Sequence, residues 1–112
     1  MDISVLKHGN VQVIKLRGDL KIGPPVDAFR QTLEEILNGG DSCLVIGLEE
    51  VPMIDSSGIG VLVRSLTSAK ARGGDLRLVN PSRLAVQTLK IVGLLKLFQV
   101  FENEQEALAS FQ

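Results

Sequence analysis

A continuous apolar run, Cys43 to Leu48, constrains the fold of this 112-residue chain more than any other feature of its sequence. A short run of this kind, without alternation, is typical of a strand that is covered on both faces. Apolar residues at helical spacing lie on either side of it, from Val26 to Leu37 and from Ile59 to Ala69. The sequence therefore predicts an α/β fold in which helices pack on a sheet.

The elements are expected in the order β-β-α-β-α-β-α-β-α. Two short runs of β type come first, and Gly9-Asn10 between them is a good tight-turn pair for a hairpin. Each later strand is followed by a helix, which predicts a mixed, mostly parallel sheet with about four flanking helices and right-handed crossovers. The expected strands cover residues 3–6, 11–16, 43–48, 76–79 and 98–101, and the expected helices begin near residues 24, 56, 82 and 104.

Two expectations concern the C-terminal part of the chain. In the third helix, four residues have the spacing of a buried face: Ala85, Val86, Leu89 and Val92. Asn103, followed three residues later by a Glu, is a capping-box start for a final helix that runs through Phe111.

The length and charge of the chain restrict its partners. A chain of 112 residues fits one domain, 1–112, and a domain of that size needs no metal or disulfide to hold it. Twelve basic and thirteen acidic residues leave a net charge of −1, so no strong field draws the chain to nucleic acid or to an anionic membrane. Base-stacking platforms are scarce, because Trp and Tyr are absent.

Cys43 is the only cysteine, which excludes a disulfide framework and a cysteine-based zinc site. We expect it to be a small buried residue. No segment reaches the roughly 18 apolar residues of a membrane span, and the N-terminus has no signal-peptide pattern. We therefore expect a cytoplasmic protein without a metal or another cofactor.

The stretch IDSSGIG joins the third expected strand to the second expected helix. Asp and Ser are preferred N-cap residues, so Asp55 or Ser56 could serve only to begin the helix. That interpretation explains one polar residue, but it does not explain Ser57 or the glycines. Gly58 and Gly60 each lower helix propensity by up to about 1 kcal/mol relative to Ala, and they provide bare backbone that another group can approach closely.

The position of this stretch, at the expected start of a helix, favours the binding of an anion. In open α/β sheets, ligands often bind where the carboxyl end of a parallel strand meets the start of a helix, because free N–H groups and the helix dipole stabilise negative charge there. A phosphate group on Ser57 would lie in that field and add about −1.5 to −2 charges. We therefore expect the Ser57 hydroxyl to reach solvent, with Ile59, Leu62 and Leu66 facing the core.

Catalytic interpretations fit less well. A serine hydrolase needs a base beside its serine, and the only histidine, His8, lies in the predicted hairpin turn. A phosphate-binding P-loop needs a lysine after its glycines, where this chain has Val61. Glu49-Glu50 is a candidate acid pair, but adjacent carboxylates on a loop are usually only solvated. We expect that the chain is not an enzyme.

Several stretches of the chain resemble one known family. IDSSGIGVL, GGDLRLVNP and the later VGL before Phe98 are similar to the STAS domain of bacterial anti-sigma factor antagonists, also called anti-anti-sigma factors, and the likeness covers nearly the whole chain. The resemblance implies a small α/β domain that binds an anti-sigma factor, itself a serine kinase, and so releases a sigma factor. It also implies that the kinase phosphorylates the antagonist to end the binding, and that a serine phosphatase restores it.

The same resemblance implies that Ser57, the second hydroxyl residue of the motif, is phosphorylated. Asp55 and Ser56 would be its neighbours in the loop that the partner binds, and Gly58 and Gly60 would let the partner approach the backbone. We expect neither nucleic acid nor a membrane as partner, and a monomer or a weak dimer.

Two positions depart from the pattern of many family members. Lys21 follows the sequence GDL where they carry an acid, and Gly47 precedes Leu48 where they carry Asp. In the family these acids lie near the phosphorylation site. Lys21 is instead a cation that could stabilise a phosphate, and we count it among the partner-binding residues.

Two other functions stay open on the sequence. One is a STAS scaffold or transporter-associated subunit that binds a partner without a phosphorylation cycle. The other is a small ligand-binding module or enzyme. A cognate kinase gene next to this one would favour the antagonist, whereas genes for a lipid-transport ATPase would favour the subunit.

Overall fold

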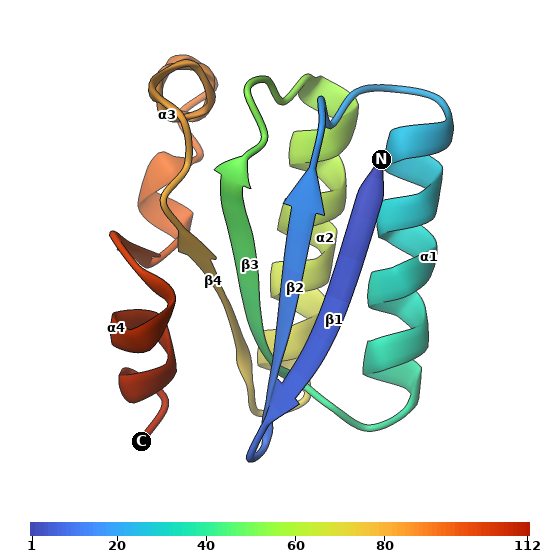
Figure 1. Cartoon of the computed structure of the whole chain (residues 1–112), viewed down its shortest axis with the longest axis vertical. Coiled ribbons are helices and arrows are strands. Elements are labelled where there is room, and N and C mark those ends of the chain that lie inside the picture. The colour runs from blue at the N-terminus through green and yellow to red at the C-terminus, as the bar shows by residue number, and fades with distance from the viewer.

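The structure, a computed structural model, describes all 112 residues and is built on one five-stranded sheet with the order β1-β2-β3-β4-β5 (Figure 1). β1 and β2 form an antiparallel hairpin, and every later pair of neighbours is parallel. The strands are β1 (Asp2–His8), β2 (Val11–Arg17), β3 (Cys43–Glu50), β4 (Asp75–Val79) and β5 (Val100–Phe101).

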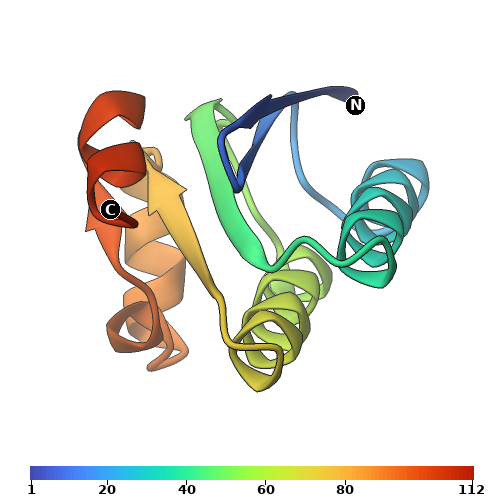
Figure 2. The same cartoon turned by 90° about the horizontal axis from the view of Figure 1, so that it is seen from below.

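Helices cover both faces of this sheet. α1 and α2 pack side by side on one face, while α4 lies on the other (Figure 2). α3 belongs to the face of α1 and α2, because its Ala85 and Leu89 join the same core. The helical elements are α1 (Pro24–Asn38), α2 (Ser56–Ala71), α3 (Arg83–Ile91), the 3-10 turn η1 (Leu95–Leu97) and α4 (Glu104–Ala109).

Alternation along β3 divides its side chains between the two faces. Leu44, Ile46 and Leu48 join the large core under α1, α2 and α3, and Val45 joins a smaller cluster under α4. β3 is therefore covered on both faces, as its continuous apolar run predicts. The largest fully buried side chains all belong to the first core: Phe29, Ile14, Leu20, Leu33, Leu44, Ile46, Leu48, Ile54, Leu62, Leu76, Leu78 and Leu89.

The order of elements, the hairpin and the helix start at Ser56 agree with the sequence prediction. Gly9, in the hairpin turn, has a positive φ of 61°, which is the backbone conformation that this turn requires. Asn103 also begins the last helix as predicted, since its side chain accepts a hydrogen bond from the backbone N–H of Glu106 at 2.9 Å.

Three details of the predicted C-terminal elements are wrong. Val92 was expected to face inward, but α3 ends at Ile91 and Val92 is 47% exposed. The expected strand over residues 98–101 is reduced to two residues, because the N–H of Phe98 closes the 3-10 turn on Leu95 and its side chain enters the core instead of pairing. α4 stops at Ala109, short of the expected Phe111.

Cys43 is only half-buried, where a buried residue was expected. It begins β3 at the end of the sheet and packs against the edge of the small cluster under α4.

Candidate functional site

The stretch IDSSGIG lies at the edge of the sheet where the parallel strands end, at the top of Figure 1. The loops that follow β2 and β3 meet here and pair through Leu20 and Ile54 as an isolated parallel bridge. The N–H of Leu20 donates to the Met53 carbonyl at 2.9 Å, and the N–H of Asp55 donates to the Leu20 carbonyl at 3.1 Å. The start of α2 is therefore attached to a loop that lies more than thirty positions earlier in the chain.

Asp55 is the N-cap of α2. Its backbone is extended (φ −93°, ψ −179°), and Oδ1 accepts from the N–H of Gly58 at 3.0 Å. Oδ2 accepts from the N–H of Ile22 at 2.8 Å. One carboxylate therefore satisfies a free donor of the helix and fixes the loop after β2 at the same time.

These hydrogen bonds also set the charge of Asp55. Partial burial acts against the ionised form and by itself would raise the pKa. The backbone N–H groups of Gly58, Ile22, Ser57 and Asp55 itself outweigh it, and together they hold the pKa of Asp55 below its ordinary value. Asp55 is thus a carboxylate at neutral pH, and its negative charge is directed at backbone donors of its own chain.

The two serines after Asp55 neither cap α2 nor hold the loop after β2. Neither the Ser56 nor the Ser57 hydroxyl makes a hydrogen bond within the chain, and neither oxygen is enclosed in the protein. Ser56 is exposed and Ser57 is half-buried, in the first turn of α2. The expectation that the Ser57 hydroxyl reaches solvent is confirmed, and so is the burial of Ile59, Leu62 and Leu66.

Gly58 serves a different purpose from the one expected. A side chain at this position would place its Cβ 2.8 Å from the Leu20 carbonyl oxygen and 2.9 Å from Leu20 Cγ. Gly58 is itself buried, so the group that approaches its backbone is the loop after β2. Close packing inside the chain explains this glycine, and access for a partner does not.

Gly60 is different, because it lies at the edge of the exposed side of α2. A Cβ at this position would lie 3.1 Å from Nη1 of Arg64, one turn further along the helix. The space that Gly60 leaves is occupied by the guanidinium of Arg64, which is exposed and forms no ion pair. Arg64 is not among the site residues expected from the sequence, although a glycine four residues before an arginine in a helix is a signal that could have identified it.

The loop after β2 adds a cation and an apolar side chain to this edge. Lys21 is exposed and makes no ion pair. Ile22 is 75% exposed, and its backbone N–H donates the hydrogen bond that Oδ2 of Asp55 accepts. Nothing in the sequence marks Ile22 as a surface residue.

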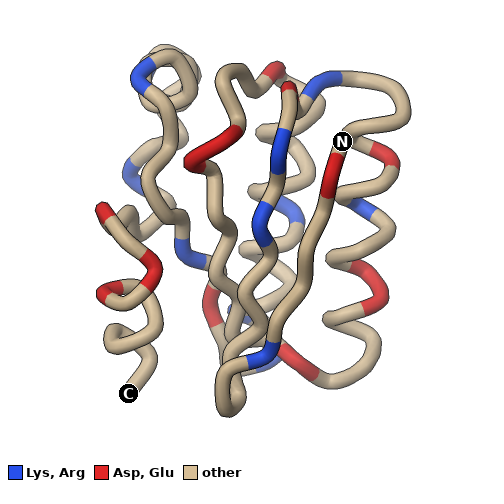
Figure 3. The backbone as a smooth tube through the Cα atoms, viewed as in Figure 1, with Lys and Arg blue, Asp and Glu red and all other residues tan.

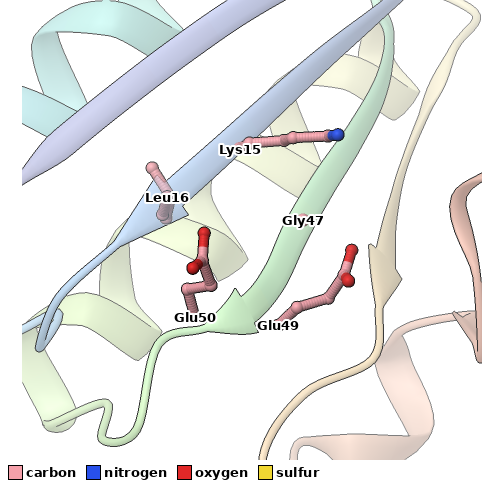
Figure 4. A pocket seen from close by; sticks show the side chains of 5 residues that line it. All are labelled: Lys15, Leu16, Gly47, Glu49 and Glu50. Carbon is pink, nitrogen blue, oxygen red and sulfur yellow. The ribbon is translucent and has the colours of Figure 1, made fainter.

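The second departure from the family pattern, Gly47, lies on the other face of the sheet, away from α2. Figure 4 shows the Lys15 side chain reaching across β3 beside Gly47, with Glu49 and Glu50 on either side of the strand end. A Cβ at Gly47 would meet Lys15 Cγ at 3.2 Å. The hollow here measures only about 100 Å³, and the nearby Arg17 is paired with Glu50 at 3.1 Å.

The titratable residues of the chain form no candidate metal centre. No group of three or more His, Cys, Asp or Glu residues could hold a metal ion. Acidic and basic residues occur along strands and helices alike and do not gather in one region (Figure 3). None of the helices has the length and apolar character needed to cross a membrane.

Comparison with known proteins identifies the family. The family described as STAS domain matches residues 2–107. The chain belongs to the STAS domain family. Its IDSSGIG stretch is therefore the joint between β3 and α2 of a STAS domain, and the five-stranded sheet with its four helices is the STAS fold.

Among the relatives of this STAS domain is the anti-sigma-B factor antagonist of Bacillus subtilis. The two are 30% identical over 95 residues, which is 84% of this chain and 84% of that protein.

Solved structures show the same fold. The anti-sigma factor antagonist SpoIIAA in its unphosphorylated form superposes with a TM-score of 0.86 at 22% identity, covering 98% of this chain and 96% of that one. The Bacillus cell fate determinant SpoIIAA in its phosphorylated form gives a TM-score of 0.80 at 22% identity, covering 99% of this chain and all of that one.

Proposed function

We propose that this STAS domain is an anti-sigma factor antagonist, that its partner is an anti-sigma factor with serine kinase activity, and that phosphorylation of Ser57 ends the binding. One observation carries the proposal: Asp55 caps α2 and leaves the Ser57 hydroxyl without an internal partner and open to solvent. The named function of the Bacillus subtilis relative supports it. In this proposal the whole chain, 1–112, acts as one cytoplasmic, non-catalytic binding domain.

The binding surface in this proposal is the edge formed by the loop after β2 and the first turn of α2. Ile22 offers an exposed apolar side chain, and Lys21 beside it offers a cation. Ser56 and Ser57 supply hydroxyl groups with no internal partner. Asp55 and Gly58 act indirectly, because they hold this surface in place through Ile22 and Leu20.

The chemistry of the switch is a phosphoryl transfer. The kinase moves the γ-phosphoryl group of ATP to the Ser57 oxygen, which loses its proton, and ADP leaves. The product carries about −1.5 to −2 additional charges in the middle of the contact. Hydrolysis of the phosphoserine by a phosphatase then restores the hydroxyl and releases inorganic phosphate.

The expected effect on binding is large. Disruption of a buried polar contact of this kind costs about 2–5 kcal/mol. At about 1.4 kcal/mol per tenfold, the affinity falls by roughly thirty-fold to a few thousand-fold. The free protein tolerates the phosphate, because the positive end of the α2 dipole stabilises it. The modification therefore changes binding far more than folding.

Calorimetric titration against the candidate kinase tests the proposal, with phosphate incorporation followed in parallel. Ser57→Ala should bind and accept no phosphate, and Ser57→Asp should bind more weakly with a melting temperature close to that of the unmodified protein. Ser56→Ala is the matched control and should both bind and accept phosphate. Equal affinities for all forms, or undiminished phosphate incorporation in Ser57→Ala, would remove Ser57 from the mechanism and favour a STAS scaffold without a switch.

A further inference from the structure

Arg64 has an unusual setting on α2. It is an exposed cation without an ion pair, and its guanidinium lies back along the helix over Gly60. Long side chains in a helix point toward its N-terminus, and here the missing side chain at residue 60 leaves the space that Arg64 fills. Any side chain at that position would compete with the guanidinium, since even a Cβ would lie 3.1 Å from Nη1.

Arg64 and Ser57 share one side of α2. Seven residues are close to two full turns, so the two positions lie nearly in line along the helix. The guanidinium beside Gly60 has already covered about half of that separation, and roughly one helical turn remains between it and Ser57. A phosphate group on Ser57 lengthens the side chain by several bonds toward Arg64. Of the two residues between them on this side of the helix, Gly60 has no side chain and Val61 is buried.

We propose that Arg64 is a built-in counter-ion for phosphate on Ser57, with Gly60 keeping the path between them open. The inference rests on the proposed phosphorylation of Ser57. In the unmodified protein the guanidinium has no ion pair and lies beside Gly60, just beyond the first turn of α2; after phosphorylation it donates to the phosphate oxygens in the geometry that favours arginine. Phosphorylation thereby adds a dianion and at the same time pairs the exposed charge of Arg64.

The other charges near this site have different positions or partners. Asp55 points its carboxylate at the backbone N–H groups of Ile22 and Gly58. On α1, Arg30 lines the groove beside Arg64 and is paired with Asp27 at 3.2 Å and Glu34 at 3.8 Å. Lys21, on the loop after β2, and Arg83, in the first turn of α3, are the other exposed cations without an ion pair at this edge of the sheet, and the experiment must separate both from Arg64.

A ³¹P NMR titration of the full chain, with phosphoserine introduced at position 57 during translation, tests the proposal without any kinase. The second pKa of a phosphoserine is ordinarily about 6, and a paired cation lowers it. Arg64→Gln should raise this pKa by about 0.15–0.7 unit, since an exposed ion pair is worth about 0.2–1 kcal/mol and one pKa unit corresponds to about 1.4 kcal/mol. Gly60→Leu, which blocks the path, should raise it in the same direction.

Lys70→Gln is the matched control, because Lys70 is an exposed cation in the last turn of the same helix. It lies about 20 Å from Ser57 along the axis, beyond the screening length at physiological salt, and should leave the pKa unchanged. The proposal is overturned if Arg64→Gln gives no more change than Lys70→Gln, or if Lys21→Gln or Arg83→Gln produces the whole shift.

These results are independent of those of the binding experiment. A kinase that ignores Ser57 would refute the proposed function and leave the measured pairing intact. An unchanged phosphate pKa in Arg64→Gln would refute the role of Arg64 and leave the phosphorylation switch intact.

Discussion

The starts of α2 and α3 lie at the same edge of the sheet, yet their serines differ in what they do. At α3, Ser82 is the N-cap: its Oγ accepts from the N–H of Ala85 at 3.0 Å and donates to the Pro52 carbonyl at 2.9 Å. At α2, Asp55 is the N-cap, and the hydroxyls of Ser56 and Ser57 bond to nothing in the chain. Folding accounts fully for the serine of α3 but leaves the serines of α2 unexplained.

A serine at a helix start indicates a site when another residue already caps the helix. A single Ser, Thr, Asp or Asn there is explained by capping, as at Ser82 and at Asn103 of α4. An additional hydroxyl residue just after the cap has no capping task and remains available to an external group. The substitutions below test this difference, from the largest expected effect to the smallest.

Asp55→Ala should cause the largest loss of stability. It removes the cap of α2 and the acceptor for the Ile22 N–H together, which should lower the free energy of unfolding by about 2–3 kcal/mol. Urea denaturation followed by circular dichroism measures the change. A loss below about 0.5 kcal/mol would mean that Asp55 does not support this edge and that the contrast with α3 is wrong.

Substitution of the two glycines of α2 by Ala should have different effects on the free energy of unfolding. Gly58→Ala forces a Cβ against the Leu20 carbonyl and should destabilise the protein by about 1–3 kcal/mol, although Ala is the better helix former. Gly60→Ala displaces only the flexible end of Arg64 and should be neutral or stabilising by up to about 1 kcal/mol. The same denaturation experiment compares them, and equal destabilisation by both substitutions would contradict the packing described for Gly58.

The serines at the starts of α3 and α2 should differ less in their contribution to stability. Ser82→Ala should lower the free energy of unfolding by about 1 kcal/mol through loss of the cap. Ser57→Ala, which removes no internal hydrogen bond, should stay within about 0.5 kcal/mol of the unmodified protein. If Ser57→Ala proves as destabilising as Ser82→Ala, the Ser57 hydroxyl has a structural task and its availability to a kinase is in doubt.

The smallest effect is a dependence on pH. The pKa of Asp55 is lower in the folded than in the unfolded protein, so its contribution is complete above the unfolded value of about 3.9 and disappears as the pH falls through the folded value. The difference in unfolding free energy between the unmodified protein and Asp55→Asn should therefore shrink as the pH falls below about 4. Urea denaturation across this range measures it, and a difference that stays constant or grows on acidification would mean that the folded pKa is not lowered.

Much of the fold can be predicted from local patterns in the sequence. The apolar run of β3 predicts its coverage on both faces, and the polar residues before Ile59 predict the start of α2 within one residue. The errors at Val92 and at residues 98–101 lie where a 3-10 turn replaces a regular element and sends Phe98 into the core. Apolar spacing alone does not distinguish these two arrangements.

The site depends more on contacts between distant segments. The sequence identifies Asp55 and Ser57, but it gives no sign that Ile22 donates to Asp55 or that Gly58 is pressed against Leu20. These contacts join residues more than thirty positions apart, so no local pattern contains them. For the same reason Gly58 was expected to give a partner access to the backbone, whereas the group that packs against it is Leu20 of the same chain.

Phosphopeptide mass spectrometry of the protein purified from its own host tests the central claim most directly, namely that Ser57 is free for modification because Asp55 caps α2. The expected result is phosphate on Ser57, absent from the capping Ser82, in a fraction that changes with growth conditions. Phosphate found on another residue while Ser57 stays unmodified under every condition, or no phosphate on the protein at all, would contradict the claim.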